Sequence, residues 1–266
     1  MPYTTLNYTV RERVGIVSFA TPERLNAITW ARLDELDAVL AEVEADQQLG
    51  ALVITGGEGK AFCVGLDLDL LEKAFGDIGY FETVVRRLDG IIRRLEALPI
   101  PTIAAVNGIT RAGGFELTLG CDFVLIADEA HYGDVHTDAA VLPAAASLRL
   151  KRRVGEQRAK EMVWTARWYD GAQAVQAGLA LRSVPRARLL EEALAFAASM
   201  TDKPRAVIVA NKRVFQLGVD AGLREGADLE LRNFVHYMST EPYGREGYTA
   251  FREGRDPSWK QSPSGA

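Results

Sequence analysis

The stretch that decides the fold is Pro-Thr-Ile-Ala-Ala-Val-Asn-Gly-Ile-Thr-Arg-Ala-Gly-Gly-Phe-Glu-Leu-Thr-Leu-Gly-Cys-Asp-Phe-Val-Leu-Ile-Ala, residues 101–127. Its apolar run 103–106 ends at an Asn-Gly pair, which is the pattern of a buried strand followed by a turn. Residues 115–119 are expected to form a short helix, and residues 123–127 a second strand. The stretch therefore predicts the alternation of strand and helix that is typical of an α/β chain.

Gly113 and Gly114 stand where the short helix begins. Glycines allow a ligand to approach the backbone closely, and the first N–H groups of a helix lack intrahelical partners. Such free donors, with the positive end of the helix dipole, suit negative charge that develops on an oxygen. Because Glu116 follows within one turn, the stretch predicts an acyl-activating site with a carboxylate beside it. Tight packing alone would also explain the glycine pair.

The glycines do not indicate a nucleotide cofactor. The pattern lacks the third glycine of the dinucleotide-binding fingerprint and the Gly-Lys-Ser/Thr of a P-loop.

The composition is that of an ordinary globular chain of 266 residues, 48% hydrophobic and 25% charged. A formal net charge of −5 argues against general nucleic-acid binding. Residues 1–30 show no secretory signal, and no apolar run approaches the ~20 residues that cross a bilayer. Cys63 and Cys121 lack the spacing of a metal site and fit reduced thiols, so we expect a cytoplasmic protein without a metal centre or a membrane partner.

Strand and helix patterns alternate on both sides of the central stretch, and the last part of the chain is helical only. The further strands are expected at 3–10 and 14–19 (as a hairpin), 51–55 and 181–184. The helices are expected at 29–45 with Thr29 as N-cap, 81–98, 144–160, a short segment after Asp170, and 187–200, 204–217, 219–238 and 242–254. We therefore expect a core over residues 1–200 and a helical region over 201–266, with a loose end from Asp256.

Several short motifs occur in a fixed order along the chain. They are Thr-Pro-Glu-Arg-Leu-Asn-Ala-Ile (21–28), Lys-Ala-Phe-Cys-Val-Gly-Leu-Asp-Leu (60–68), Ala-Ala-Val-Asn-Gly (104–108) with Gly-Gly-Phe-Glu-Leu (113–117) and Cys-Asp (121–122), Arg-Val-Gly (153–155) to Ala-Gly-Leu (177–179), and Thr-Ala-Phe (249–251). In order and spacing, the chain resembles the enoyl-CoA hydratase/isomerase (crotonase) superfamily over nearly its whole length.

The resemblance implies a spiral of ββα units with two roughly perpendicular sheets. It also implies a C-terminal helical region that assembles trimers or dimers of trimers. The implied substrate is an acyl-CoA thioester, with coenzyme A as part of the substrate and no metal or redox cofactor. By position, the backbone N–H groups of Leu66 and Gly113 would form an oxyanion hole, although residues 65–67 would also suit a simple strand-to-helix turn. The residues that the resemblance assigns to substrate and CoA binding are Lys60, Ala61, Val64, Gly65, Asp67, Gly114, Phe251 and Lys260.

Hydratases of this family use two glutamates, one to activate water and one to handle the proton at the α-carbon. The first maps onto Glu116, for which a solvent-facing helical position is the alternative. Counting from Ala130 and checking at Pro143, His136 falls at the second position. An imidazole near neutral pKa can also donate or accept a proton, whereas a surface histidine would have no such role. Asp138, two residues after His136, is considered as a partner that orients the ring, but a direct contact between them is not expected.

Three other side chains carry weaker signals. His131 is expected to face solvent, and His236 to pack or lie at an interface. Arg111 suits either a carboxylate-bearing acyl group or a subunit interface.

The default interpretation is reversible hydration of a 2-enoyl-CoA. C–C bond hydrolysis of a β-dicarbonyl substrate and double-bond isomerisation are the alternative reactions. A degenerate CoA-binding subunit is the non-enzymatic alternative.

Overall fold

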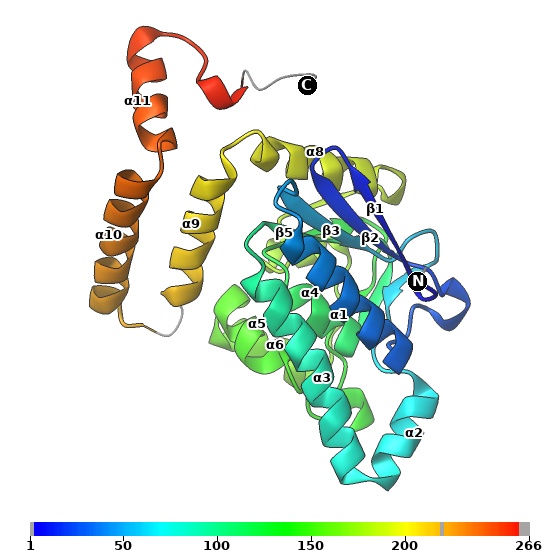
Figure 1. Cartoon of the computed structure of the whole chain (residues 1–266). Coiled ribbons are helices and arrows are strands. Elements are labelled where there is room, and N and C mark those ends of the chain that lie inside the picture. Colours follow the sequence, from blue (N-terminus) through cyan, green and yellow to red (C-terminus); the bar gives the residue numbers. More distant parts are fainter. Residues whose placement is uncertain (1–2, 219–220, 261–266) are drawn as a thin grey trace.

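The computed structural model describes residues 3–218 and 221–260 and contains a main sheet and a smaller second sheet (Figure 1). The strands of the main sheet, in spatial order, are β1 (Leu6–Arg11), β2 (Val14–Phe19), β3 (Ala51–Thr55), β5 (Thr102–Val106), β7 (Phe123–Ala127) and β9 (Arg182–Val184). Those of the second sheet are β4 (Ala61–Cys63), β6 (Ile109–Arg111) and β8 (Tyr132–Gly133). The β1–β2 hairpin is antiparallel as expected, and every other pairing is parallel.

Consecutive strands alternate between the two sheets from β3 to β8. Each turn of the chain therefore places one strand in each sheet before a helix returns it, which confirms the expected spiral of ββα units. β3 and β5 are buried throughout, as strands covered on both faces must be. β5 belongs to the main sheet and β6 to the second sheet, and both precede α4. The central stretch, residues 101–127, therefore contributes strands to both sheets.

The chain also forms α-helices and short 3-10 segments. The α-helices are α1 (Trp30–Ala45), α2 (Leu68–Gly76), α3 (Ile78–Ala97), α4 (Gly113–Leu119), α5 (Ala146–Val154), α6 (Glu156–Thr165), α7 (Gly171–Gln176), α8 (Leu189–Thr201), α9 (Arg205–Leu217), α10 (Leu223–Thr240) and α11 (Tyr243–Glu253). The 3-10 segments are η1 (Pro22–Arg24), η2 (Thr137–Ala139), η3 (Arg186–Arg188) and η4 (Ser258–Lys260).

Most expected helices are present, but α2 was not expected, and α10 begins at Leu223 while residues 219–220 of the expected helix 219–238 lie outside the described part. Thr29 is the N-cap of α1, and its side chain accepts a hydrogen bond from the Arg32 amide at 3.2 Å. A single helix over 144–160 is wrong, because the chain there forms α5 and α6. Gly155 separates them with φ +80°, a backbone conformation outside the α-helical region.

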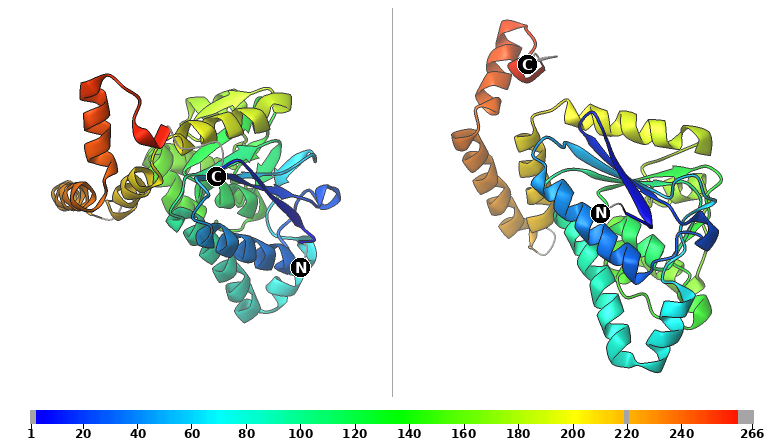
Figure 2. Two further views of the ribbon diagram at one scale, coloured as in Figure 1. Left: turned by 45° about the horizontal axis from the view of Figure 1, so that its top comes forward. Right: turned by 45° about the vertical axis from the view of Figure 1, so that its right-hand side comes forward.

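Helices cover both sides of the main sheet. α8 packs against β2, β3, β5 and β7, while α1 packs against α3 on the other side (Figures 1 and 2). The short helix α4 contacts α3, α5, β4 and β6, and all its residues are buried. Glu116, the residue of α4 that is predicted to be catalytic, is therefore enclosed by these helices and strands.

The helices α9–α11 stand apart from the sheets in both figures, so the expected helical region after residue 201 is present (Figures 1 and 2). Buried Lys212 of α9 ties it to the core, donating to Asp122 Oδ2 at 2.7 Å and to the Ile100 carbonyl at 2.9 Å. The boundary at residue 200 stays a prediction. The loose end expected from Asp256 is ordered as far as η4, and residues 261–266 lie outside the described part.

None of the helices within 3–218 and 221–260 combines the length and the apolar character that a membrane span requires.

Candidate active site

Leu66 lies where the chain passes from β4 to α2, and its N–H group points away from the neighbouring backbone. Ile28 N donates to the Gly65 carbonyl at 2.8 Å, and Asp67 N donates to the Ile28 carbonyl at 3.0 Å. These two bonds form an isolated parallel bridge on either side of Leu66. In such a bridge the N–H of the central residue is directed to the opposite side.

Gly113 begins α4 directly beside this turn. The preceding Ala112 has φ +48° and ψ −128°, a strained conformation that turns the chain into the helix. A methyl group placed on Gly65 would lie 3.0 Å from Gly113 N, so the two glycines' backbones are adjacent. Within residues 3–218 and 221–260, neither Leu66 N nor Gly113 N donates to a protein acceptor. The two amides expected to form an oxyanion hole are therefore neighbours, and both are free.

Gly114 is required for packing. A methyl group there would lie 2.1 Å from the Cys63 carbonyl oxygen, closer than any real contact. Only glycine lets α4 approach β4 closely enough to bring Gly113 beside residue 65.

Glu116 is buried on α4 with 2% of its surface exposed, which excludes the solvent-facing alternative. Its Oε1 accepts a hydrogen bond from the Ala145 amide at 2.7 Å. Burial raises the pKa of Glu116, while the Ala145 amide and the charge of His136 act in the opposite direction. Burial and a raised pKa are features that acid–base residues of active sites commonly show.

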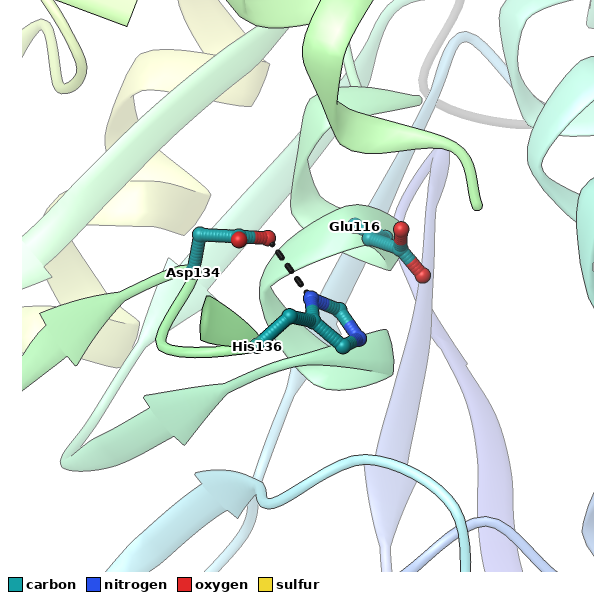
Figure 3. Close-up of side chains that lie close together, drawn as sticks. All are labelled: Glu116, Asp134 and His136. Carbon is teal, nitrogen blue, oxygen red and sulfur yellow. Dashed lines mark hydrogen bonds and ion pairs between the residues drawn. The ribbon is translucent and has the colours of Figure 1, made fainter. Parts of the chain in front are cut away.

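His136 lies beside Glu116 and is held by Asp134, a residue that the sequence analysis missed. Its Nδ1 is 2.9 Å from Asp134 Oδ1, and the second ring nitrogen points away from Asp134 (Figure 3). The chain between the two residues is not extended, because Val135 has φ +52°. Asp138, the candidate partner considered first, is exposed on η2. The only sequence signal for Asp134 was its spacing of two from His136.

The carboxylates set the protonation of the imidazole. Burial alone would lower the pKa of His136, but the hydrogen bond to Asp134 and the charges of Asp134 and Glu116 outweigh it, so the pKa is raised. The two acidic groups thus stabilise the protonated form of the half-buried ring more than water stabilises it for a free imidazole.

Ligand atoms of Glu116, Asp134 and His136 lie within 4.8 Å of one another, a separation at which a cation could also be held. The hydrogen bond between His136 Nδ1 and Asp134 Oδ1 occupies one such atom on each of two residues.

The other assigned binding residues divide into two groups. Lys60 is exposed, Ala61 is buried in β4, and Val64 is half-buried next to the Gly65 turn. Asp67 is buried, caps α2 through a bond to Asp69 N and pairs with Arg24 at 2.6 Å. These residues belong to β4 or to the segments directly before and after it.

Phe251 and Lys260 are not brought to the site within one chain. Phe251 is 87% exposed on α11, which lies far from α4 in Figure 1. Lys260 ends η4, and its side chain lies outside the described part. Their roles stay predictions that require a second copy of the chain.

Arg111, His131 and His236 are all exposed. The expectation that His131 faces solvent is confirmed.

This combination of a ββα spiral, adjoining free amides at a helix start and a buried glutamate places the chain in a known class. Residues 9–262 match the enoyl-CoA hydratase/isomerase family. The chain belongs to this family, as its motifs indicated.

Similar proteins cover the full length of the chain. A probable enoyl-CoA hydratase of Mycobacterium bovis is 33% identical over 260 residues, covering 97% of this chain and 99% of the relative. A probable enoyl-CoA hydratase of Rhizobium meliloti is 33% identical over 261 residues, covering 98% and 99%. The crystal structure of an enoyl-CoA hydratase from Bacillus anthracis superimposes with a TM-score of 0.90 at 30% identity, covering 97% of this chain and 100% of the other.

Proposed function

We propose that this chain catalyses the reversible addition of water to a 2-enoyl-CoA thioester. The observation that carries the proposal is the cluster of buried Glu116, buried Asp134 and half-buried His136 beside the free amides of Leu66 and Gly113. The family membership and the names of the relatives support the choice of reaction and of an acyl-CoA substrate.

The amides would bind the thioester carbonyl oxygen. Charge moves onto this oxygen as water adds to the β-carbon, so donors fixed in advance stabilise the transition state more than the bound substrate. Removal of one such donor typically lowers kcat by ~10²–10³-fold.

Glu116 and His136 would divide the proton transfers. The Glu116 carboxylate takes a proton from water while the water oxygen bonds to the β-carbon and the π bond between the α- and β-carbons breaks. The electron pair passes to the α-carbon and the thioester oxygen, and His136 delivers its proton to the α-carbon. The proton on Glu116 then returns to His136, directly or through solvent, so the sum is one water added across one double bond, and no metal or redox cofactor enters.

The assembly would be a trimer or a dimer of trimers formed through the C-terminal helices. Support comes from α10, which exposes large apolar side chains: Leu231, Phe234, Val235 and Met238. Such an assembly would also bring Phe251 and Lys260 of one copy near the site of another. The buried free thiols Cys63 and Cys121 suit a cytoplasmic setting.

The test is incubation with enoyl-, β-hydroxyacyl- and β-ketoacyl-CoA thioesters in buffer containing EDTA, with products followed by mass. Gain of water by the enoyl thioester supports the proposal. An unchanged mass with a shifted double bond would establish isomerisation instead, and chain cleavage a C–C hydrolase. Binding without turnover of any thioester would establish a CoA-binding subunit.

The key variant is Glu116→Gln, which keeps the shape of the side chain and removes its basicity. We expect kcat to fall by at least ~10²-fold, because general acid–base groups contribute ~10²–10⁴-fold. Glu72→Gln, on an exposed position of α2, is the matched control and should retain activity. Turnover of Glu116→Gln at the control's level would remove this residue from the mechanism.

A further inference from the structure

We infer that Asp134 is a positioning residue that orients the His136 ring and aligns it with the oxyanion-hole amide of Gly113. This inference deepens the proposed hydration and rests on it. Asp134 does not touch the reacting atoms in this scheme, and it acts only through the groups that do.

Burial and geometry single out the Asp134 side chain. It is fully buried, with Oδ1 at 2.9 Å from His136 Nδ1 and Oδ2 without a hydrogen-bond partner within the described residues. A buried carboxylate oxygen without a hydrogen-bond partner lowers the stability of the fold, so a compensating interaction is expected. The charged hydrogen bond to the imidazole supplies one.

The bond determines which nitrogen faces the reaction. Asp134 accepts from Nδ1–H, so Nε2 carries the exchangeable proton when His136 is protonated and points to the side opposite Asp134 (Figure 3). A carboxylate in this position prevents the ring from turning and stabilises the imidazolium form.

The backbone of the same residue fixes the oxyanion hole. The Asp134 carbonyl oxygen accepts from Ala112 N at 3.0 Å, which extends the β6–β8 ladder by one bond up to the residue before Gly113. The left-handed φ of Val135 then turns the chain back so that His136 faces the Asp134 side chain. A strained backbone conformation is kept only where the surrounding structure fixes it. Two such residues, Ala112 and Val135, lie at and next to the hydrogen bond between Ala112 N and the Asp134 carbonyl.

Charged groups face the His136 ring from two elements. Asp134 lies on its own loop, and Glu116 lies on α4. Removing one of these charges should therefore change the titration of the ring measurably.

The experiment compares Asp134→Asn and Asp134→Ala with Asp138→Asn, an exposed carboxylate of the same loop. The chain has three histidines, so ring resonances of protein labelled at histidine can be followed by NMR against pH, and His136→Gln assigns the signal. We expect Asp134→Asn to lower the pKa of His136 by ~1 unit or more, since an opposite charge at this distance shifts a pKa by ~1–3 units. Asp138→Asn and the signal of His131 should show no comparable shift.

Activity supplies the second measurement. Asp134→Asn keeps an acceptor for Nδ1–H but loses the charge, so the alkaline limb of the pH–rate profile should move to lower pH. Asp134→Ala also frees the ring, so kcat should fall by at least ~10-fold while KM changes by less than ~3-fold. Because unfolded protein also lowers the apparent kcat without changing KM, kcat is calculated per folded molecule, and the shift of the pH profile distinguishes the two causes.

Two outcomes would separate the inference from the proposed function. Wild-type protein without hydratase turnover overturns the proposed function. Active wild type with Asp134 variants of unchanged kcat, pH profile and His136 pKa overturns the role of Asp134. A shifted pKa with unchanged kcat also overturns it, because the contact would then be structural only.

Discussion

The most demanding test of the oxyanion hole is Gly65→Ala, because one methyl group is added between the two amides. At φ +91° the new methyl carbon would lie 3.0 Å from Gly113 N and 3.0 Å from the Ala112 methyl group. Both contacts are tighter than ordinary van der Waals packing, and neither neighbour is a flexible side chain. The alanine must therefore cover the Gly113 amide or displace the turn that aims the Leu66 amide.

The expected loss follows from these contacts. Covering or misaligning one oxyanion donor lowers kcat by ~10²–10³-fold, equivalent to ~2.7–4 kcal/mol of transition-state stabilisation. An alanine held in a glycine-type conformation also costs ~1–3 kcal/mol of stability. Gly65→Ala should thus be folded but less stable, with its largest effect on kcat.

The matched control is Gly178→Ala. Gly178 also has a left-handed φ, +77°, but a methyl group there meets nothing within 4 Å. This variant carries the backbone cost without any change at the amides. Steady-state hydration of an enoyl-CoA and urea unfolding, measured on both variants, separate catalysis from stability.

If the added methyl group acts on the oxyanion hole, Gly65→Ala and Gly178→Ala must differ in kcat although both lose stability. If Gly65→Ala hydrates the substrate within ~2-fold of wild type, the adjoining amides do not form the oxyanion hole. If Gly178→Ala loses as much activity as Gly65→Ala, the effect belongs to backbone strain and not to the site.

Two further predictions follow from the buried polar groups. The pH profile of kcat/KM should be bell-shaped. It should rise as Glu116 ionises through its raised pKa and fall as His136 deprotonates through its own raised pKa. A profile with a single limb would contradict this division of roles. Asn26→Ala should lower the free energy of unfolding in urea by ~2–4 kcal/mol, because buried Asn26 donates to the Gly56 and Ala61 carbonyls and accepts from Thr21 N. Asn211→Ala, at an exposed position, should stay within ~0.5 kcal/mol of wild type.

Much of the fold could be predicted because its signals are local. The apolar runs 51–55, 103–106 and 123–127 are buried strands of one sheet, and Thr29 caps its helix as its side-chain chemistry suggests. The helix break at Gly155 was missed although a glycine after Lys-Arg-Arg-Val is a usual helix end.

The site could be predicted only in part, for a different reason. Glu116 and the two amides follow from motif positions and from the start of α4. The role of Asp134 depends on the φ of Val135, and a β-branched residue is a rare occupant of the left-handed region. No residue-type preference indicates such a conformation, so the sequence did not reveal the pairing of Asp134 with His136.

The contact with Asp134 explains how a histidine can stand where hydratases of this family are expected to use a second glutamate. Two neighbouring glutamates that share one proton carry a net charge of −1 and hold one transferable proton. In the proposed scheme, a carboxylate at Asp134, an imidazolium at His136 and a carboxylate at Glu116 would also sum to −1 and would also hold one transferable proton. A neutral histidine alone would lack that proton, and an imidazolium without Asp134 would leave the site uncharged overall. The aspartate therefore keeps the charge and proton count of the glutamate pair, which is why its removal should affect the proton donor more than substrate binding.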